Sequence, residues 1–163
     1  SFVPEVAPLL DALEEILNPR VVTYTGKLYK AWQLLQGVGK EKNPYENVLR
    51  EVASDLEALN KELAEKGGAV VGINSFTLDG DKTAISDAKD ILAKKGVTYK
   101  NVWFDSNGEA GKFTSGLYTF PTTYVVDKNG NIVGEPIVGA ITGKNQAETL
   151  RKLIDQAIAN SKG

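Results

Sequence analysis

Residues 119–139 read TFPTTYVVDKNGNIVGEPIVG, and their pattern predicts the local fold of this part of the chain. The segment 122–127 (TTYVVD) is rich in β-branched and aromatic residues, which is typical of a strand. Asn129-Gly130 is a strong signal for a tight hairpin turn, because both residues tolerate a positive φ. Residues 131–139 (NIVGEPIVG) then supply a second strand. The stretch therefore predicts an antiparallel hairpin near the C-terminus.

Three apolar runs upstream predict further strands. They are 21–25 (VVTYT), 69–74 (AVVGIN) and 97–104 (VTYKNVWF). The run at 69–74 shows no alternation of polar and apolar residues, which is typical of a strand that is buried on both faces of a parallel sheet.

Segments with apolar residues at helical spacing separate these strands. The expected helices cover 4–17, 27–36, 44–66, 82–95, 109–115 and 146–159. The helix at 44–66 has the clearest start signal. Asn43 can cap it, Pro44 suits the first helical position, and Glu46 stands where a capping box places its acid.

This order of elements predicts an α/β fold with a central mixed sheet and helices on both faces. We find no repeat and no internal linker, and 163 residues suit one domain. Residues 1–163 are therefore expected to form a single domain, with 1–43 as an N-terminal strand and helical additions.

The composition excludes several classes of chemistry. The chain contains no Cys, no His and no Met. Disulfides, thiolate nucleophiles and a Ser–His–Asp triad are therefore excluded. The net charge of −2, without a basic stripe, argues against nucleic-acid binding. No apolar run reaches the roughly 18 residues of a membrane span. The joint loss of three residue types favours an engineered sequence over a processed natural domain of unusual composition.

The segment 119–139 also resembles a known family. It contains, in order, an apolar residue, Pro-Thr, a strand that ends in Val-Asp, a glycine turn and a second strand that ends in Gly. This order is similar to the end of a thioredoxin-like domain of the TlpA/ResA-type thiol–disulfide oxidoreductase (redoxin) family. Residues 56–74 (LEALNKELAEKGGAVVGIN) resemble the first long helix of that family and the strand after it. Residues 79–116 resemble its helix–strand insertion. The resemblance covers 44–160 and implies a thioredoxin-like three-layer fold.

The resemblance implies a cis peptide bond before Pro121. Phe120, Pro121 and Thr122 would then line a cleft where a partner's extended chain pairs with the backbone. The alternative from the residues alone is a trans proline at the first position of a strand.

The paired cysteines of the family are missing. The family has a CxxC motif at the start of its long helix, where the helix dipole lowers the thiol pKa. Counting back from Leu56 places the two positions at Glu46 and Leu49, or at Tyr45 and Val48 with a shift of one residue. The residues between the first strand and these positions, 26–43, depart from the family pattern.

Two acidic features have alternative interpretations. Glu46 can act as an acid, a base or a cation ligand, but its place in the cap is the favoured interpretation. Asp79, Asp81 and Asp87 near Gly80 lack the order of an EF-hand, and they are expected to form a solvated helix cap. We expect no metal and no cofactor.

These observations lead to three hypotheses of function. The first is a thioredoxin-like domain without redox activity, which keeps a structural role or binds a protein or peptide at the Pro121 cleft. The second is an engineered scaffold without a native substrate. The third is an interaction protein that uses the helices expected at 4–17 and 27–36. The resemblance also implies a location outside the cytoplasm.

Overall fold

A computed structural model describes residues 6–8, 18–29, 45–117 and 119–160 of the chain. Its main feature is a six-stranded sheet with the order β1-β6-β5-β2-β7-β8, beside a two-stranded ribbon of β3 and β4. The strands are β1 (Val6–Pro8), β2 (Arg20–Thr25), β3 (Lys27–Tyr29), β4 (Tyr45–Asn47), β5 (Ala69–Asn74), β6 (Lys100–Trp103), β7 (Thr122–Val126) and β8 (Ile132–Val138). The helices are α3 (Leu49–Ala64), η2 (Ser75–Gly80), α4 (Lys82–Lys94), α5 (Glu109–Ser115) and α6 (Lys144–Asn160).

The sheet is mixed, as expected. β2 pairs in parallel with β5 on one side and antiparallel with β7 on the other. β5 in turn pairs in parallel with β6. The expected strands at 21–25 and 69–74 are confirmed, and they lie next to each other in the sheet.

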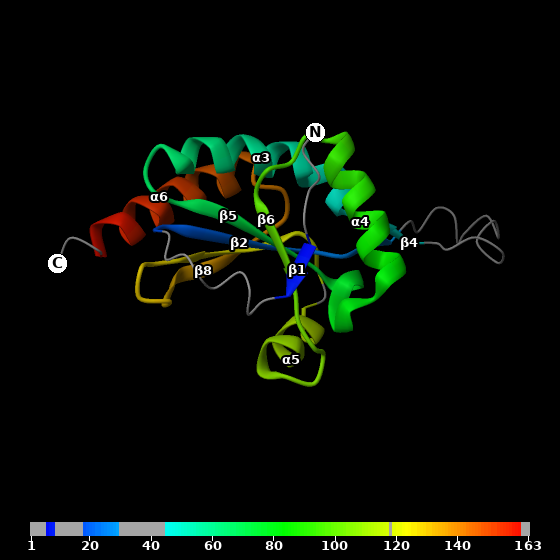
Figure 1. The fold of residues 1–163 in the computed structure, drawn as a ribbon. Helices are drawn as coiled ribbons and strands as arrows, with labels where there is room; N and C mark the ends of the chain where they lie inside the picture. Colours follow the sequence, from blue (N-terminus) through cyan, green and yellow to red (C-terminus); the bar gives the residue numbers. More distant parts are fainter. Residues whose placement is uncertain (1–5, 9–17, 30–44, 118, 161–163) are drawn as a thin grey trace.

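Helices cover both faces of this sheet (Figure 1). On one face, apolar residues of α3, α4 and α6 form the main core, and Leu56, Leu92 and Ile154 among them are almost fully buried. On the other face, Ala110 of α5 packs against a second cluster that contains Tyr24, Ile73, Val102 and Phe104. The predicted α/β architecture is therefore confirmed.

The hairpin predicted from residues 119–139 is also confirmed. β7 and β8 pair antiparallel, with an irregularity in register between Thr123 and Val125. Gly130 has a φ of 85° in the connecting turn. The carboxylate of Asp127 accepts hydrogen bonds from the N–H groups of Asn129 and Asn131. Local hydrogen bonds thus stabilise the turn that the sequence indicates.

The expected helix at 4–17 is wrong at its described residues. Val6, Ala7 and Pro8 form the short strand β1, which pairs in parallel with β6. Val6 also packs against the main core. A proline is compatible with an edge strand because its missing N–H can lie on the unpaired side. The rest of 4–17 lies outside the described residues.

The helix expected at 27–36 and the helix start expected at residue 44 are also wrong at the described residues of these segments. Residues 27–29 form β3, and Glu46 lies in β4, with Leu28 and Glu46 opposite each other. α3 begins at Leu49. The predicted capping role of Asn43 falls outside the described residues, and Glu46 precedes the helix. Pairing with a second strand therefore outweighs the helical signal of residues 44–47.

The expected helices at 82–95, 109–115 and 146–159 correspond to α4, α5 and α6. The side chain of Asp81 accepts a hydrogen bond from the N–H of Ala84, so its predicted capping role is confirmed. Among the described residues, no helix is both long and apolar enough for a membrane span.

Candidate functional site

The start of α3 lies at the edge of the sheet where the parallel strands β2 and β5 end. The N–H of Val48 donates a hydrogen bond of 2.8 Å to the carbonyl oxygen of Gly26, the residue after β2. Carboxyl ends of parallel strands are common positions for ligand sites in α/β folds. A ligand site of this fold is therefore expected at this edge.

A third segment, which contains Phe120, packs against Gly26 at this edge. A Cβ atom at position 26 would lie 2.3 Å from Oγ of Ser75 and 2.8 Å from the ring of Phe120. The lack of a side chain therefore lets the Phe120 ring and Ser75 approach the backbone at the end of β2. Through Gly26, the start of α3 and the segment before β7 become neighbours.

The segment 119–122 has a defined local geometry. The Phe120–Pro121 peptide bond is cis. The hydroxyl of Thr122 donates to the carbonyl oxygen of Thr119 at 2.6 Å, and the N–H of Gly139 donates to the carbonyl oxygen of Pro121 at 3.0 Å. Phe120 is half-buried, whereas Pro121 and Thr122 are buried. A second cis bond precedes Pro19.

The four positions considered for the missing cysteines fall into two structural groups. Tyr45 and Glu46 lie in β4. Val48 is the residue just before α3 and Leu49 is its first residue, and their side chains are 3% and 1% exposed. Both apolar side chains thus belong to the interior and offer no reactive group. The assignment of either pair to the cysteine positions stays a prediction.

An amide network at this edge was missed by the sequence analysis. The Nδ2 of Asn47 donates to Oδ1 of Asn74 at 3.1 Å, and Nδ2 of Asn74 donates to Oδ1 of Asn47 at 2.6 Å. Oδ1 of Asn47 also accepts from the N–H of Leu49, the first residue of α3, two residues further along the chain. The available signal was an asparagine just before an apolar helical run, because asparagine side chains commonly bond to the backbone two residues on.

A groove of about 900 Å³ opens beside this network. Asn47 lines it from the end of β4, Arg50 from the first turn of α3 and Phe76 from η2. α4 contributes a mixed wall of acidic, basic and apolar side chains. These are Thr83, Ala84, Asp87, Asp90, Ile91 and Lys94, with Asp81 just before the helix.

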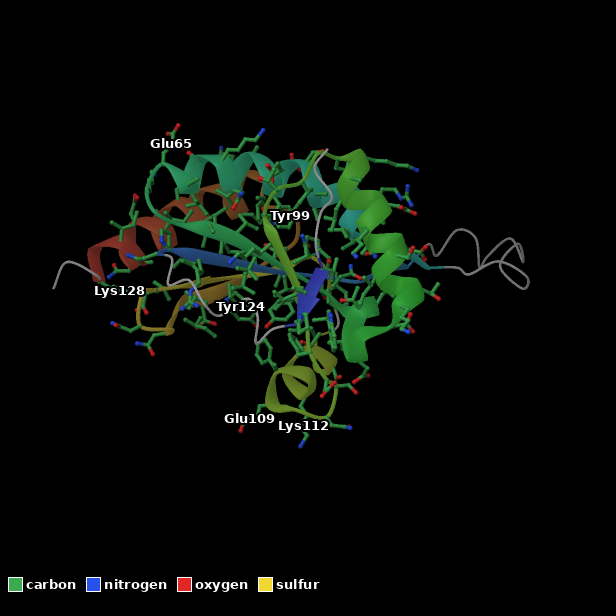
Figure 2. All side chains as sticks on the ribbon, viewed as in Figure 1. Glu65, Tyr99, Glu109, Lys112, Tyr124 and Lys128 are labelled. Atoms are coloured by element: carbon green, nitrogen blue, oxygen red, sulfur yellow. The ribbon has the colours of Figure 1, made fainter. Side chains whose placement is uncertain are left out.

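On the opposite face of the sheet, three aromatic rings meet. The ring centroids of Tyr24 and Tyr124 are 5.9 Å apart, and Phe113 of α5 lies 5.7 Å from Tyr24 and 5.4 Å from Tyr124. Phe120 packs against the cluster that contains Tyr24, so this face adjoins the edge described above. Figure 2 shows Tyr124 on this side, with Glu109 and Lys112 of α5 pointing away from the sheet.

Burial keeps the tyrosine hydroxyls of this cluster protonated. Desolvation, with a smaller contribution from Tyr124, raises the pKa of Tyr24 to about 12. Burial also raises the pKa of Tyr124. Neutral phenols are poor general bases at neutral pH, so the cluster supplies an aromatic surface and hydroxyl groups.

Acidic residues of the described ranges do not form a metal centre. No group of three His, Cys, Asp or Glu side chains there is arranged to hold an ion. Asp79 accepts hydrogen bonds from the N–H and the hydroxyl of Ser106, and these bonds hold the pKa of its carboxyl below the usual value. The expected helix cap is therefore formed by Asp81 alone: Asp79 bonds to Ser106 instead, and Asp87 lies within α4.

Comparison with solved structures identifies the fold. A protein assigned as the thiol:disulfide interchange protein DsbE of Chlorobium tepidum has a TM-score of 0.55 and 22% identity, over 88% of this chain and 82% of its own. A DsbF homologue from Corynebacterium diphtheriae has a TM-score of 0.52 and 21% identity, over 85% of this chain and 71% of its own. StoA from Bacillus subtilis has a TM-score of 0.52 and 16% identity, over 86% of this chain and 85% of its own. The chain therefore has a thioredoxin-like fold, as the resemblance implies.

Sequence comparisons add one partial match. The family described as "JetA: Wadjet protein JetA" matches residues 1–65, a range that ends just after α3. No curated protein matches the chain. The fold assignment consequently rests on the structural similarity, which covers 85–88% of this chain in these three structures.

Proposed function

We propose that this chain is a binding domain on the thioredoxin-like fold, which holds an extended polypeptide and does not itself exchange disulfides. The proposed contact surface, called here the Pro121 surface, is centred on the half-buried side chain of Phe120, and the buried residues Gly26, Val48, Pro121 and Thr122 support it from within. An extended partner would be recognised mainly through its backbone and through apolar side chains.

The observation that carries this proposal is the convergence at Gly26. Val48 bonds to its carbonyl oxygen, and the Phe120 ring occupies the space that a side chain would fill. The start of a helix and an aromatic-proline segment are thus held together at the edge of the sheet. Groups that the scaffold already orders lose little conformational entropy when a ligand binds.

The absence of cysteine supports binding without redox chemistry. Thiol–disulfide exchange needs a thiolate, and none of the 163 residues can supply one. At the start of α3, the side chains of Val48 and Leu49 are apolar and buried. Any affinity of this surface must then come from non-covalent contacts.

The two alternative hypotheses differ in the support that the described residues give them. An engineered scaffold would share this fold and composition, and a lack of binding at the Pro121 surface would favour it. The hypothesis of a helical interaction surface loses support, because the described parts of 4–17 and 27–36 are the strands β1 and β3.

The proposal is tested with an unfolded protein whose thiols are blocked, S-carboxymethylated α-lactalbumin. It is added to the isotope-labelled chain while backbone amide shifts are recorded by NMR. We expect saturable shift changes at Gly26, Val48, Phe120 and Thr122, and none along the exposed face of α6. The absence of saturable changes, or changes confined to other surfaces, would overturn the proposed function.

A further inference from the structure

Asn47 and Asn74 form a reciprocal pair of side-chain amides beneath the Pro121 surface. Each amide donates to the oxygen of the other, with N–O distances of 3.1 and 2.6 Å. Asn74 ends β5 and is 6% exposed, whereas Asn47 ends β4 and precedes α3. The pair thus joins the end of a central strand to the beginning of the helix.

Further hydrogen bonds extend the pair to neighbouring segments. Nδ2 of Asn74 also donates to the hydroxyl of Thr25 at 2.8 Å, and its Oδ1 accepts from the N–H of Phe76 at 3.2 Å. Oδ1 of Asn47 accepts from the N–H of Leu49 at 3.1 Å. The network therefore connects β2, β5, η2 and α3 at the sheet edge.

We infer that Asn74 is a positioning residue for the Pro121 surface: its amide holds the start of α3 at the strand ends and thereby sets the affinity for an extended polypeptide. This inference rests on the proposed function. Because Asn74 is buried, it acts through the position of α3, since the N–H of Val48 at the start of this helix bonds to Gly26, against which the Phe120 ring packs. Buried hydrogen-bond networks of this kind specify one arrangement, since every broken bond leaves an unsatisfied group.

The test compares Asn74→Ala with Asn101→Ala, a matched control. Asn101 is a buried asparagine of β6 whose Nδ2 donates to the carbonyl oxygen of Tyr99, outside this network. Both variants are expected to lose stability in urea. We expect Asn74→Ala alone to bind S-carboxymethylated α-lactalbumin about tenfold more weakly and to shift the amide signal of Val48.

A second pair of variants keeps the test decisive if Asn74→Ala does not fold. Asn47→Ala removes the partner amide, whereas Asn47→Asp retains oxygens that can accept from Asn74 and from the N–H of Leu49. We expect Asn47→Asp to recover part of the affinity that Asn47→Ala loses. Equal loss in both Asn47 variants, or equal affinity in the Asn74 and Asn101 variants, would overturn the positioning role. Absence of binding by the unmodified chain would instead overturn the proposed function.

Discussion

The N–H of Val48 donates a hydrogen bond to the carbonyl oxygen of Gly26 at 2.8 Å, across the segment that contains the β3–β4 ribbon. This bond fixes the entry of α3 to the end of β2. The ring of Phe120 lies against the same glycine. The Pro121 surface therefore depends on a residue without a side chain.

Gly26→Ala is expected to destabilise the fold by about 1–3 kcal/mol, because the added Cβ would overlap Ser75 and the Phe120 ring. Urea unfolding measures the loss. The matched control is Gly108→Ala, where the nearest of the surrounding atoms would lie 3.7 Å from the new Cβ. Equal stability of the two variants would contradict the close packing at Gly26.

Leu56→Ala is expected to cost about 2–5 kcal/mol, because Leu56 is 1% exposed in the main core and its truncation leaves a cavity. Thermal or urea unfolding provides the measurement. Ile132→Ala serves as the comparison, since Ile132 is 54% exposed, and its cost should stay near 0.5 kcal/mol. A similar cost at both positions would show that α3 does not pack as described.

Glu57→Ala is expected to reduce the free energy of unfolding by about 1–3 kcal/mol, because three hydrogen bonds lose their acceptor. The buried carboxylate of Glu57 accepts from the N–H of Thr98 at 2.8 Å, from its hydroxyl at 2.5 Å and from the N–H of Tyr99 at 3.2 Å. Glu57→Gln keeps one acceptor oxygen and should recover part of the loss. Glu65→Gln, at an exposed position at the end of the same helix, is the control and should be nearly neutral. If Glu57→Ala were equally neutral, the carboxylate would not hold the segment before β6.

Stability is expected to fall as the pH rises from 10 towards 12. Burial raises the pKa of Tyr24 from 10.0 to about 12, so the folded state binds the phenol proton more tightly than the unfolded chain. The resulting stabilisation is complete below pH 10 and is lost as the pH passes through this window. Burial and Glu57 raise the pKa of Tyr99 as well, which acts in the same direction.

Urea midpoints measured across this pH range, together with the near-ultraviolet absorbance of the phenolate, check this prediction. Tyr24→Phe should show a shallower decline than the unmodified chain, because one of the shifted groups is removed. Identical pH profiles of the two proteins would contradict a protonated, buried Tyr24.

The parts of the fold that sequence analysis predicts correctly depend on local interactions. The turn at Asn129-Gly130 is stabilised by bonds to Asp127, only a few residues away. β5 is an apolar run of six residues, and α4 is long enough for apolar residues to recur at helical spacing. The strands at 6–8, 27–29 and 45–47 are three residues each, so their patterns are too short to outweigh neighbouring helical signals.

The candidate site was predictable only in part for the same reason. Phe120, Pro121 and Thr122 were identified through a family resemblance, but their proximity to Gly26 arises from packing across the sheet edge. The pair of Asn47 and Asn74 has no signature as a pair, because residues on different strands become partners only after the sheet has formed.

Three properties follow directly from the order of residues: the chemistry that this chain lacks, the hairpin near its C-terminus, and the alternation of strands and helices that leads to an α/β sheet. Composition, turn preferences and hydrophobic periodicity are local properties, so they can be identified along the chain. The starting residue of α3, the short segments that form strands and the side chains that meet at Gly26 depend instead on the packed fold. Those outcomes depend on contacts between distant residues, whose free energies are gained only when the partners are packed together.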